Sequence, residues 1–132
     1  MEDKYHGEGT LLYKDDYEYY GMWYHGKRHG LGILTHPDGT KKMGHWKDNL
    51  PLYTYLYYTN GEKYYGKDVN FKPNGCGLYK YTQGDLYKGQ YFNGMQHGLG
   101  YYYFNDSNMS YLGELVNGKF EGIGIISCEN FV

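Results

Sequence analysis

Short segments in which Tyr, Trp, Ile and Thr alternate with polar or small residues follow one another along the whole chain, separated by glycine-containing turns. Five reference glycines mark the interval: Gly21, Gly44, Gly66, Gly89 and Gly113, which lie 23, 22, 23 and 24 residues apart. Alternation with a period of two indicates β-strands, and a nearly fixed interval indicates stacked repeats. The pattern therefore predicts an all-β chain in which each repeat is one β-hairpin of an elongated, single-layer antiparallel sheet.

The alternation sorts the side chains onto two faces of the predicted sheet. One face receives Tyr19, Gly21 and Trp23, and the second strand of the same hairpin adds Gly30 and Gly32. Large rings on one strand are thus expected to lie flat over the bare glycine backbone of its neighbour. This arrangement predicts a core that the sheet makes from its own rings, without a second layer.

The opposite face is predicted to carry a continuous apolar stripe. Its members are expected to be Ile33, Leu56, Leu78, Phe92, Tyr101 and Ile125. An apolar stripe on a single-layer sheet promotes aggregation unless a partner covers it, so it is a candidate binding surface.

Two repeats depart from the pattern. In the second, Tyr53 and Tyr55 take the places expected for the glycine pair, and Pro51 predicts a local bulge or bend. In the third, Asp68 stands at the Trp position and Phe71 replaces the turn glycine.

The spacing also sets the predicted boundaries within a single domain of residues 1–132. A partial repeat, 1–18, is followed by repeats 19–41, 42–63, 64–86 and 87–110 and by a partial repeat, 111–132. Because both ends expose a strand edge, a homodimer through the open ends is one expectation.

Composition supports this picture and excludes several functions. The chain has 20 Tyr and 21 Gly, which favours a thin sheet with wet faces over a helical core. The net charge of -2 is spread evenly, without a basic stripe, which argues against nucleic acid and weakens the case for a membrane surface.

The termini and the cysteines predict a cytoplasmic protein. The charged residues after Met1 do not form a signal peptide, and no segment is apolar enough for a membrane span. Cys76 and Cys128 lie two repeats apart, too far for a disulfide in such a stack, and free thiols are typical of a reducing compartment.

No catalytic, cofactor or metal site is predicted. His6, His29 and His97 occupy one column, but neighbours in it would lie about 10 Å apart, too far to share one zinc. A site between two chains remains the alternative. Asp15-Asp16 falls at a turn position, and the chain lacks the nucleophile-elbow, zinc-protease and phosphate-loop motifs.

The stretch from Tyr19 to Gly32, with Gly21, Trp23, Gly26 and Gly30 between them, resembles the MORN repeat (membrane occupation and recognition nexus). The resemblance extends over essentially the whole chain. It implies an elongated, twisted sheet and a role as an interaction or scaffold module. Proteins with this repeat occur in axonemal and cytoskeletal assemblies and at membrane junctions, and some carry lipid-kinase or lysine-methyltransferase domains.

We therefore expect a non-enzymatic module that binds a helix or an extended segment of a protein partner, plausibly in a cytoskeletal or ciliary assembly. The residues expected to contact the partner are the ring-face aromatics Tyr19, Trp23, Trp46, Tyr64, Tyr87, Tyr91 and Tyr102. The alternative is an adaptor that binds phosphoinositides at a membrane surface.

Overall fold

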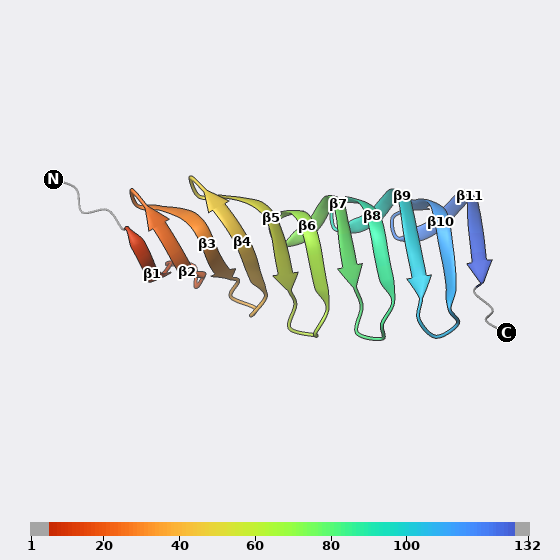
Figure 1. Cartoon of the computed structure of the whole chain (residues 1–132), viewed down its shortest axis with the longest axis horizontal. Helices are drawn as coiled ribbons and strands as arrows, with labels where there is room; N and C mark the ends of the chain where they lie inside the picture. The colour runs from red at the N-terminus through yellow and green to blue at the C-terminus, as the bar shows by residue number, and fades with distance from the viewer. Residues whose placement is uncertain (1–5, 129–132) are drawn as a thin grey trace. The chain divides into compact units, whose positions relative to one another are not determined.

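The computed structural model describes residues 6–128, which form eleven β-strands and no helix (Figure 1). The strands are β1 (Gly7–Leu12), β2 (Glu18–Tyr24), β3 (Lys27–Thr35), β4 (Lys41–Lys47), β5 (Leu50–Tyr57), β6 (Lys63–Val69), β7 (Lys72–Lys80), β8 (Leu86–Phe92), β9 (Met95–Phe104), β10 (Met109–Val116) and β11 (Lys119–Cys128). They follow the sequence order as an antiparallel meander, which confirms the predicted all-β fold of successive hairpins.

The strands belong to two units, residues 1–59 and 60–132, and each is described by itself. In the first unit, β1 to β5 pair in order, each antiparallel to the next. In the second unit, β6 to β11 do the same. Among residues 6–128 there is no helix that could span a bilayer.

A two-residue turn with positive φ at both positions closes the hairpin of each repeat. The turns are His25-Gly26, Asp48-Asn49, Asn70-Phe71, Asn93-Gly94 and Asn117-Gly118. This is type I′ geometry, whose twist matches that of the flanking strands. Phe71 is the unusual member, because a bulky residue rarely adopts its φ of +64°. Its N–H donates to the Asp68 carboxylate at 3.1 Å, so the two departures of the third repeat support each other.

Wider loops join one hairpin to the next. In the loop from His36 to Thr40, the Gly39 N–H donates to the His36 carbonyl at 2.8 Å. The Thr40 N–H donates to the Asp38 side chain at 2.7 Å. Asp16 occupies the position of Gly39 in the first such loop, with a φ of +67°, which confirms its predicted place in a turn.

A β-bulge beside the reference glycine of each repeat explains the unequal spacing. In the first repeat, two steps along β2 from Gly21 match four steps along β3 from Gly32. The third, fourth and fifth hairpins follow the same register. In the second repeat, two steps along β4 from Gly44 match only three along β5 from Thr54, which produces the shortest interval. One added residue between β9 and β10 produces the longest.

The core of a regular repeat is a tyrosine ring laid across a pair of facing glycines. Gly21 pairs with Gly32, and a Cβ on Gly32 would overlap the ring and hydroxyl of Tyr19. The Tyr19 hydroxyl donates to the Met22 carbonyl at 3.0 Å. The same bond to the residue three positions later is made by Tyr64, Tyr87 and Tyr111, at 2.7, 2.8 and 2.9 Å. Each ring therefore covers the glycines, and each hydroxyl pairs a backbone carbonyl beside the bulge.

Tryptophan and the hairpin turns connect neighbouring repeats in the first unit. The Trp46 indole donates to the Gly32 carbonyl at 3.3 Å, and its ring meets the Tyr19 ring edge to face at 5.6 Å. The Asn49 N–H of the next turn donates to the Arg28 carbonyl at 3.1 Å. These contacts explain why the repeats stack at a fixed distance.

The second repeat builds its core from a different pair of residues. Lys42 stands at the tyrosine position, and Thr54 faces Gly44 where the other repeats have glycine. Both side chains are buried, and the Thr54 methyl would lie 3.0 Å from a Cβ on Gly44. Tyr53 and Tyr55 point to the other face and are 56% and 48% exposed. The prediction that these tyrosines replace the glycine pair is therefore wrong.

The bulge of the second hairpin has one residue fewer than the other bulges, and this places Leu56 on the ring face. Leu56 pairs with the buried Lys42 and is 0% exposed, so its predicted place on the second apolar face is also wrong. The physical reason is that side-chain direction alternates along a strand, so that one residue fewer in the bulge reverses the direction of every later side chain in that strand. The bulge expected near Pro51 is present, although it belongs to the general pattern of the hairpins.

Candidate functional site

Most of the aromatic residues expected to contact a partner form the core of the sheet. Their exposed fractions are 0% for Tyr19, 5% for Trp23, 3% for Trp46, 1% for Tyr64, 0% for Tyr87 and 6% for Tyr91, while Tyr102 is half-buried. The Tyr87 and Tyr91 rings meet edge to face at 5.1 Å. This corrects the expectation that these rings present their outer faces, since six of the seven offer almost no surface.

The environment of these phenols keeps them neutral. Burial raises the pKa of Tyr87 to about 12, with a further rise from the neighbouring Tyr81. Burial likewise raises the pKa of Tyr91 and, together with a 2.9 Å hydrogen bond to Asp85, that of Tyr102. Neutral phenols that donate to fixed acceptors act as structural hydrogen-bond donors rather than as bases or nucleophiles.

The opposite face of the second unit carries an exposed row that crosses six strands. Its members are Tyr65, Leu78, Lys88, Tyr101, Leu112 and Ile125, and each pairs in register with the next. The five apolar members are between 41% and 62% exposed. We call this set the second-unit row.

The first unit has a matching first-unit row of Tyr20, Ile33, Met43 and Tyr55, which are likewise neighbours in register. Tyr20, Met43 and Tyr55 are 47%, 37% and 48% exposed, and Ile33 is half-buried. The Tyr20 hydroxyl donates to the Glu8 carboxylate at the side of the row. In both units the face away from the rings is therefore apolar and open.

The stripe predicted from the sequence corresponds to these rows, with one exchange. Leu78, Tyr101 and Ile125 lie in the second-unit row, Ile33 lies in the first-unit row, and Phe92 is exposed on the same face near a hairpin turn. Tyr55 takes the place predicted for Leu56.

The members that sequence reasoning missed are Tyr20, Met43, Tyr65, Lys88 and Leu112. Each comes one position before a reference glycine, and this constant offset was the signal that could have found them.

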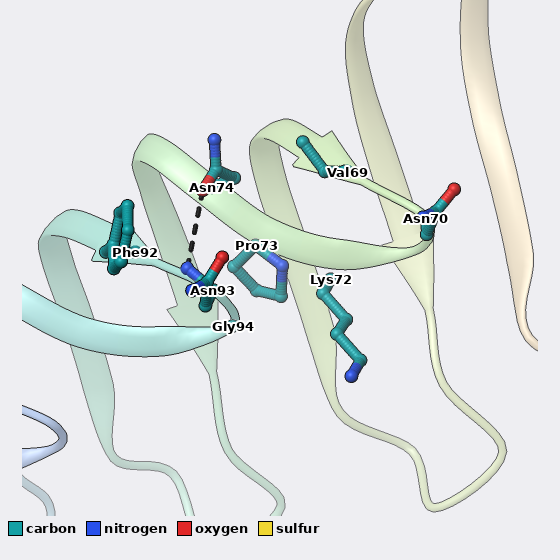
Figure 2. A pocket seen from close by; sticks show the side chains of 8 residues that line it. All are labelled: Val69, Asn70, Lys72, Pro73, Asn74, Phe92, Asn93 and Gly94. Carbon is teal, nitrogen blue, oxygen red and sulfur yellow. Dashed lines mark hydrogen bonds between the residues drawn. The ribbon is translucent and has the colours of Figure 1, made fainter.

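A pocket of about 460 Å³ lies beside the second-unit row, where two hairpin turns approach each other (Figure 2). Its lining residues are Val69, Asn70, Lys72, Pro73, Asn74, Phe92, Asn93 and Gly94. The repeat pattern of the sequence did not predict this pocket.

The histidines and cysteines do not assemble into a centre within residues 6–128. No group of three or more His, Cys, Asp or Glu there is placed to hold a metal ion. His6 packs against the His25 ring at 4.8 Å, and its Nδ1 accepts the His25 backbone N–H at 3.4 Å. Within residues 6–128, Cys76 and Cys128 form no disulfide, and both are exposed.

The family model of the MORN repeat matches residues 1–16, 19–41, 72–86, 87–109 and 111–130. The chain belongs to the MORN repeat family. This family is generally not catalytic. The segment 42–71 is unmatched, and it contains the substitutions at Lys42, Thr54, Asp68 and Phe71 that change the MORN core. No curated protein sequence matches this MORN chain.

Proposed function

We propose that this MORN chain is a non-enzymatic interaction module whose outer face receives a helix or an extended segment of a partner protein. The observation that carries the proposal is the second-unit row, in which Tyr65 and Leu78 lie side by side, as do Tyr101, Leu112 and Ile125, with Lys88 between the two groups. Contiguous exposed apolar surface of this kind marks interaction sites in soluble domains. The rings on the other face are buried, whereas the rows are open to a partner.

The dimensions of the row suit such a partner. Six side chains on strands spaced about 4.8 Å apart span about 24 Å, which is the length of a helix of about 16 residues. Lys88 interrupts the row on its third strand, so an acidic residue of the partner is favoured at that point. A scaffold role in a cytoskeletal or ciliary assembly, and a cytoplasmic location, are narrower proposals supported by the assemblies in which MORN repeats occur.

Site-specific photo-cross-linking tests the proposal. Benzoylphenylalanine at Tyr101 or Leu112, expressed in the source cell, should form a discrete adduct with the same protein, because both side chains lie in the second-unit row. The matched control carries the probe at Asp106, which is exposed in the loop between β9 and β10 and outside the row. Equal adducts at Asp106, or none at either row position, would contradict the proposal.

Binding to phosphoinositides is the alternative, and a vesicle experiment separates the two. The even charge distribution predicts little sedimentation with phosphoinositide-containing vesicles at physiological salt. Strong, salt-sensitive sedimentation that survives Tyr101→Ser would favour the membrane role over the protein partner.

A further inference from the structure

The pocket beside the second-unit row is lined by Pro73, which stands where the first and fourth repeats carry longer side chains. The residue two positions after each hairpin turn points to the ring face: Arg28 in the first repeat, Pro73 in the third and Gln96 in the fourth. The Arg28 guanidinium lies 4.8 Å from the Trp46 ring centre and donates to a carbonyl of the next turn. Gln96 is 8% exposed and donates to the Tyr81 hydroxyl at 2.7 Å. The second and third repeats have the shorter Pro51 and Pro73 at this position, and Pro73 lines the pocket.

The two turns are nevertheless tied together around the opening. The Gly94 N–H donates to the Pro73 carbonyl at 3.1 Å, and the Asn93 N–H donates to the Asn74 side-chain oxygen at 3.4 Å. Figure 2 shows the second of these bonds between the two turns. These hydrogen bonds connect the two turns that line the pocket, so the pocket is a fixed part of the stacked hairpins.

The polar lining is cationic and rich in amide donors. Lys72 is the single charged residue among the lining residues. Its side-chain ammonium forms no ion pair or hydrogen bond with any described part of the chain. Its aliphatic stem runs along Gly94, where a Cβ would come within 3.4 Å of the Lys72 Cδ. The carboxamides of Asn70 and Asn93 add donors. An anionic group is the complement of such a lining.

The rim of the pocket is apolar and continuous with the outer face. Val69 and Phe92 are 56% and 60% exposed and end the strands β6 and β8 that carry Tyr65 and Lys88 of the second-unit row. Val69 and Phe92 come four positions after Tyr65 and Lys88, about 13 Å along the strands at about 3.3 Å per residue, so a segment that follows β6 or β8 away from the row reaches the pocket.

We propose that this pocket anchors an acidic side chain of an extended partner segment. The carboxylate lies against the Lys72 ammonium and the asparagine amides, and an adjacent apolar residue packs on Val69 and Phe92. The proposal rests on the proposed function, because the anchor serves a segment that binds the same face.

The probe is a capped heptapeptide with one Glu flanked by Leu, compared with the same peptide carrying Gln. Titration should shift the side-chain amide NMR signals of Asn70 and Asn93 in a saturable way, and the Gln peptide should bind about tenfold more weakly. Lys72→Gln should weaken binding of the Glu peptide to the level seen with the Gln peptide. Lys27→Gln is the matched control, since Lys27 follows the first hairpin turn as Lys72 follows the third, and binding should not change.

Filling the pocket gives an independent test. Pro73→Gln places there the residue that the fourth repeat already accommodates, so the fold should persist while the Glu peptide loses binding at least about tenfold. Equal binding of the Glu and Gln peptides, no binding of either, or unchanged binding in both Lys72→Gln and Pro73→Gln would overturn the anchor. Row adducts that persist in those variants would leave the proposed function standing.

Discussion

Four tyrosines, Tyr19, Tyr64, Tyr87 and Tyr111, stabilise the regular repeats in two ways. Each ring fills the space over facing glycines, and each hydroxyl pairs a carbonyl in the bulge. A side chain on the covered glycine would displace the ring and break the hydrogen bond together. The glycines of this MORN chain are therefore required for packing as well as for turn geometry.

Gly32→Ala should lower the free energy of unfolding by about 1–3 kcal/mol, because the new methyl overlaps the Tyr19 ring. The matched control is Gly9→Ala at the equivalent position of β1, where the nearest atoms belong to Trp23 and lie at least 3.6 Å away. Its effect should stay within about 0.5 kcal/mol. Urea denaturation measures both variants, and equal losses would contradict the account.

Alkaline unfolding should follow the ionisation of the buried phenols. The pKa of Tyr87 is raised by burial from 10.0 to about 12, so the unfolded chain loses this proton more easily than the folded one. The stability that the neutral phenol contributes is complete below pH 10 and is lost as the pH rises towards 12.

Tyrosinate absorbance and circular dichroism, recorded together, check this prediction. Part of the tyrosinate absorbance should appear only together with the loss of β-structure, because the Tyr87 phenol is buried and its pKa is raised. If all tyrosines ionised in one step near pH 10 while the sheet persisted, the buried-phenol core would be contradicted.

At the scale of the element, the second repeat shows that one hairpin can exchange the ring-on-glycine core for another. Lys42 and Thr54 replace the tyrosine and the glycine together, and the bulge loses one residue. The Thr54 methyl approaches Gly44 where a ring lies in the regular repeats. The two substitutions should therefore depend on each other.

A double-mutant cycle tests this dependence. Lys42→Tyr alone should destabilise the chain by about 1–3 kcal/mol, because the ring meets Thr54. Thr54→Gly alone should cost about 1 kcal/mol or more through lost packing and backbone entropy. The double variant should be more stable than the sum predicts by at least about 1 kcal/mol, whereas additive losses would refute the coupling.

The same repeat shows what the sequence could and could not predict. The hairpins and the ring over glycine follow from local residue choice and were predicted in the regular repeats. The face of Leu56 depends on the number of residues in a bulge, and Tyr53 and Tyr55 resembled simple replacements of glycine. The pocket was not predicted because its lining comes from the turn regions of two successive hairpins.

At the scale of the whole molecule, the two faces of the sheet have different roles within each unit. The ring face is a core whose largest side chains are fully buried, and the outer rows are open apolar surface. A repeat that contacts only its neighbours keeps this division along the array. Substitutions on one face should therefore change stability, and those on the other should change binding.

The most direct test measures both properties on one variant of each face, with the partner recovered by cross-linking. Tyr87→Phe with Tyr91→Phe should lower the melting temperature, because the bond to the Gln90 carbonyl is lost, and should leave the affinity unchanged. Tyr101→Ser with Leu112→Ser should leave the melting temperature unchanged and weaken binding at least about tenfold. The account would be contradicted if the ring-face variant lost the partner while the outer-face variant kept it.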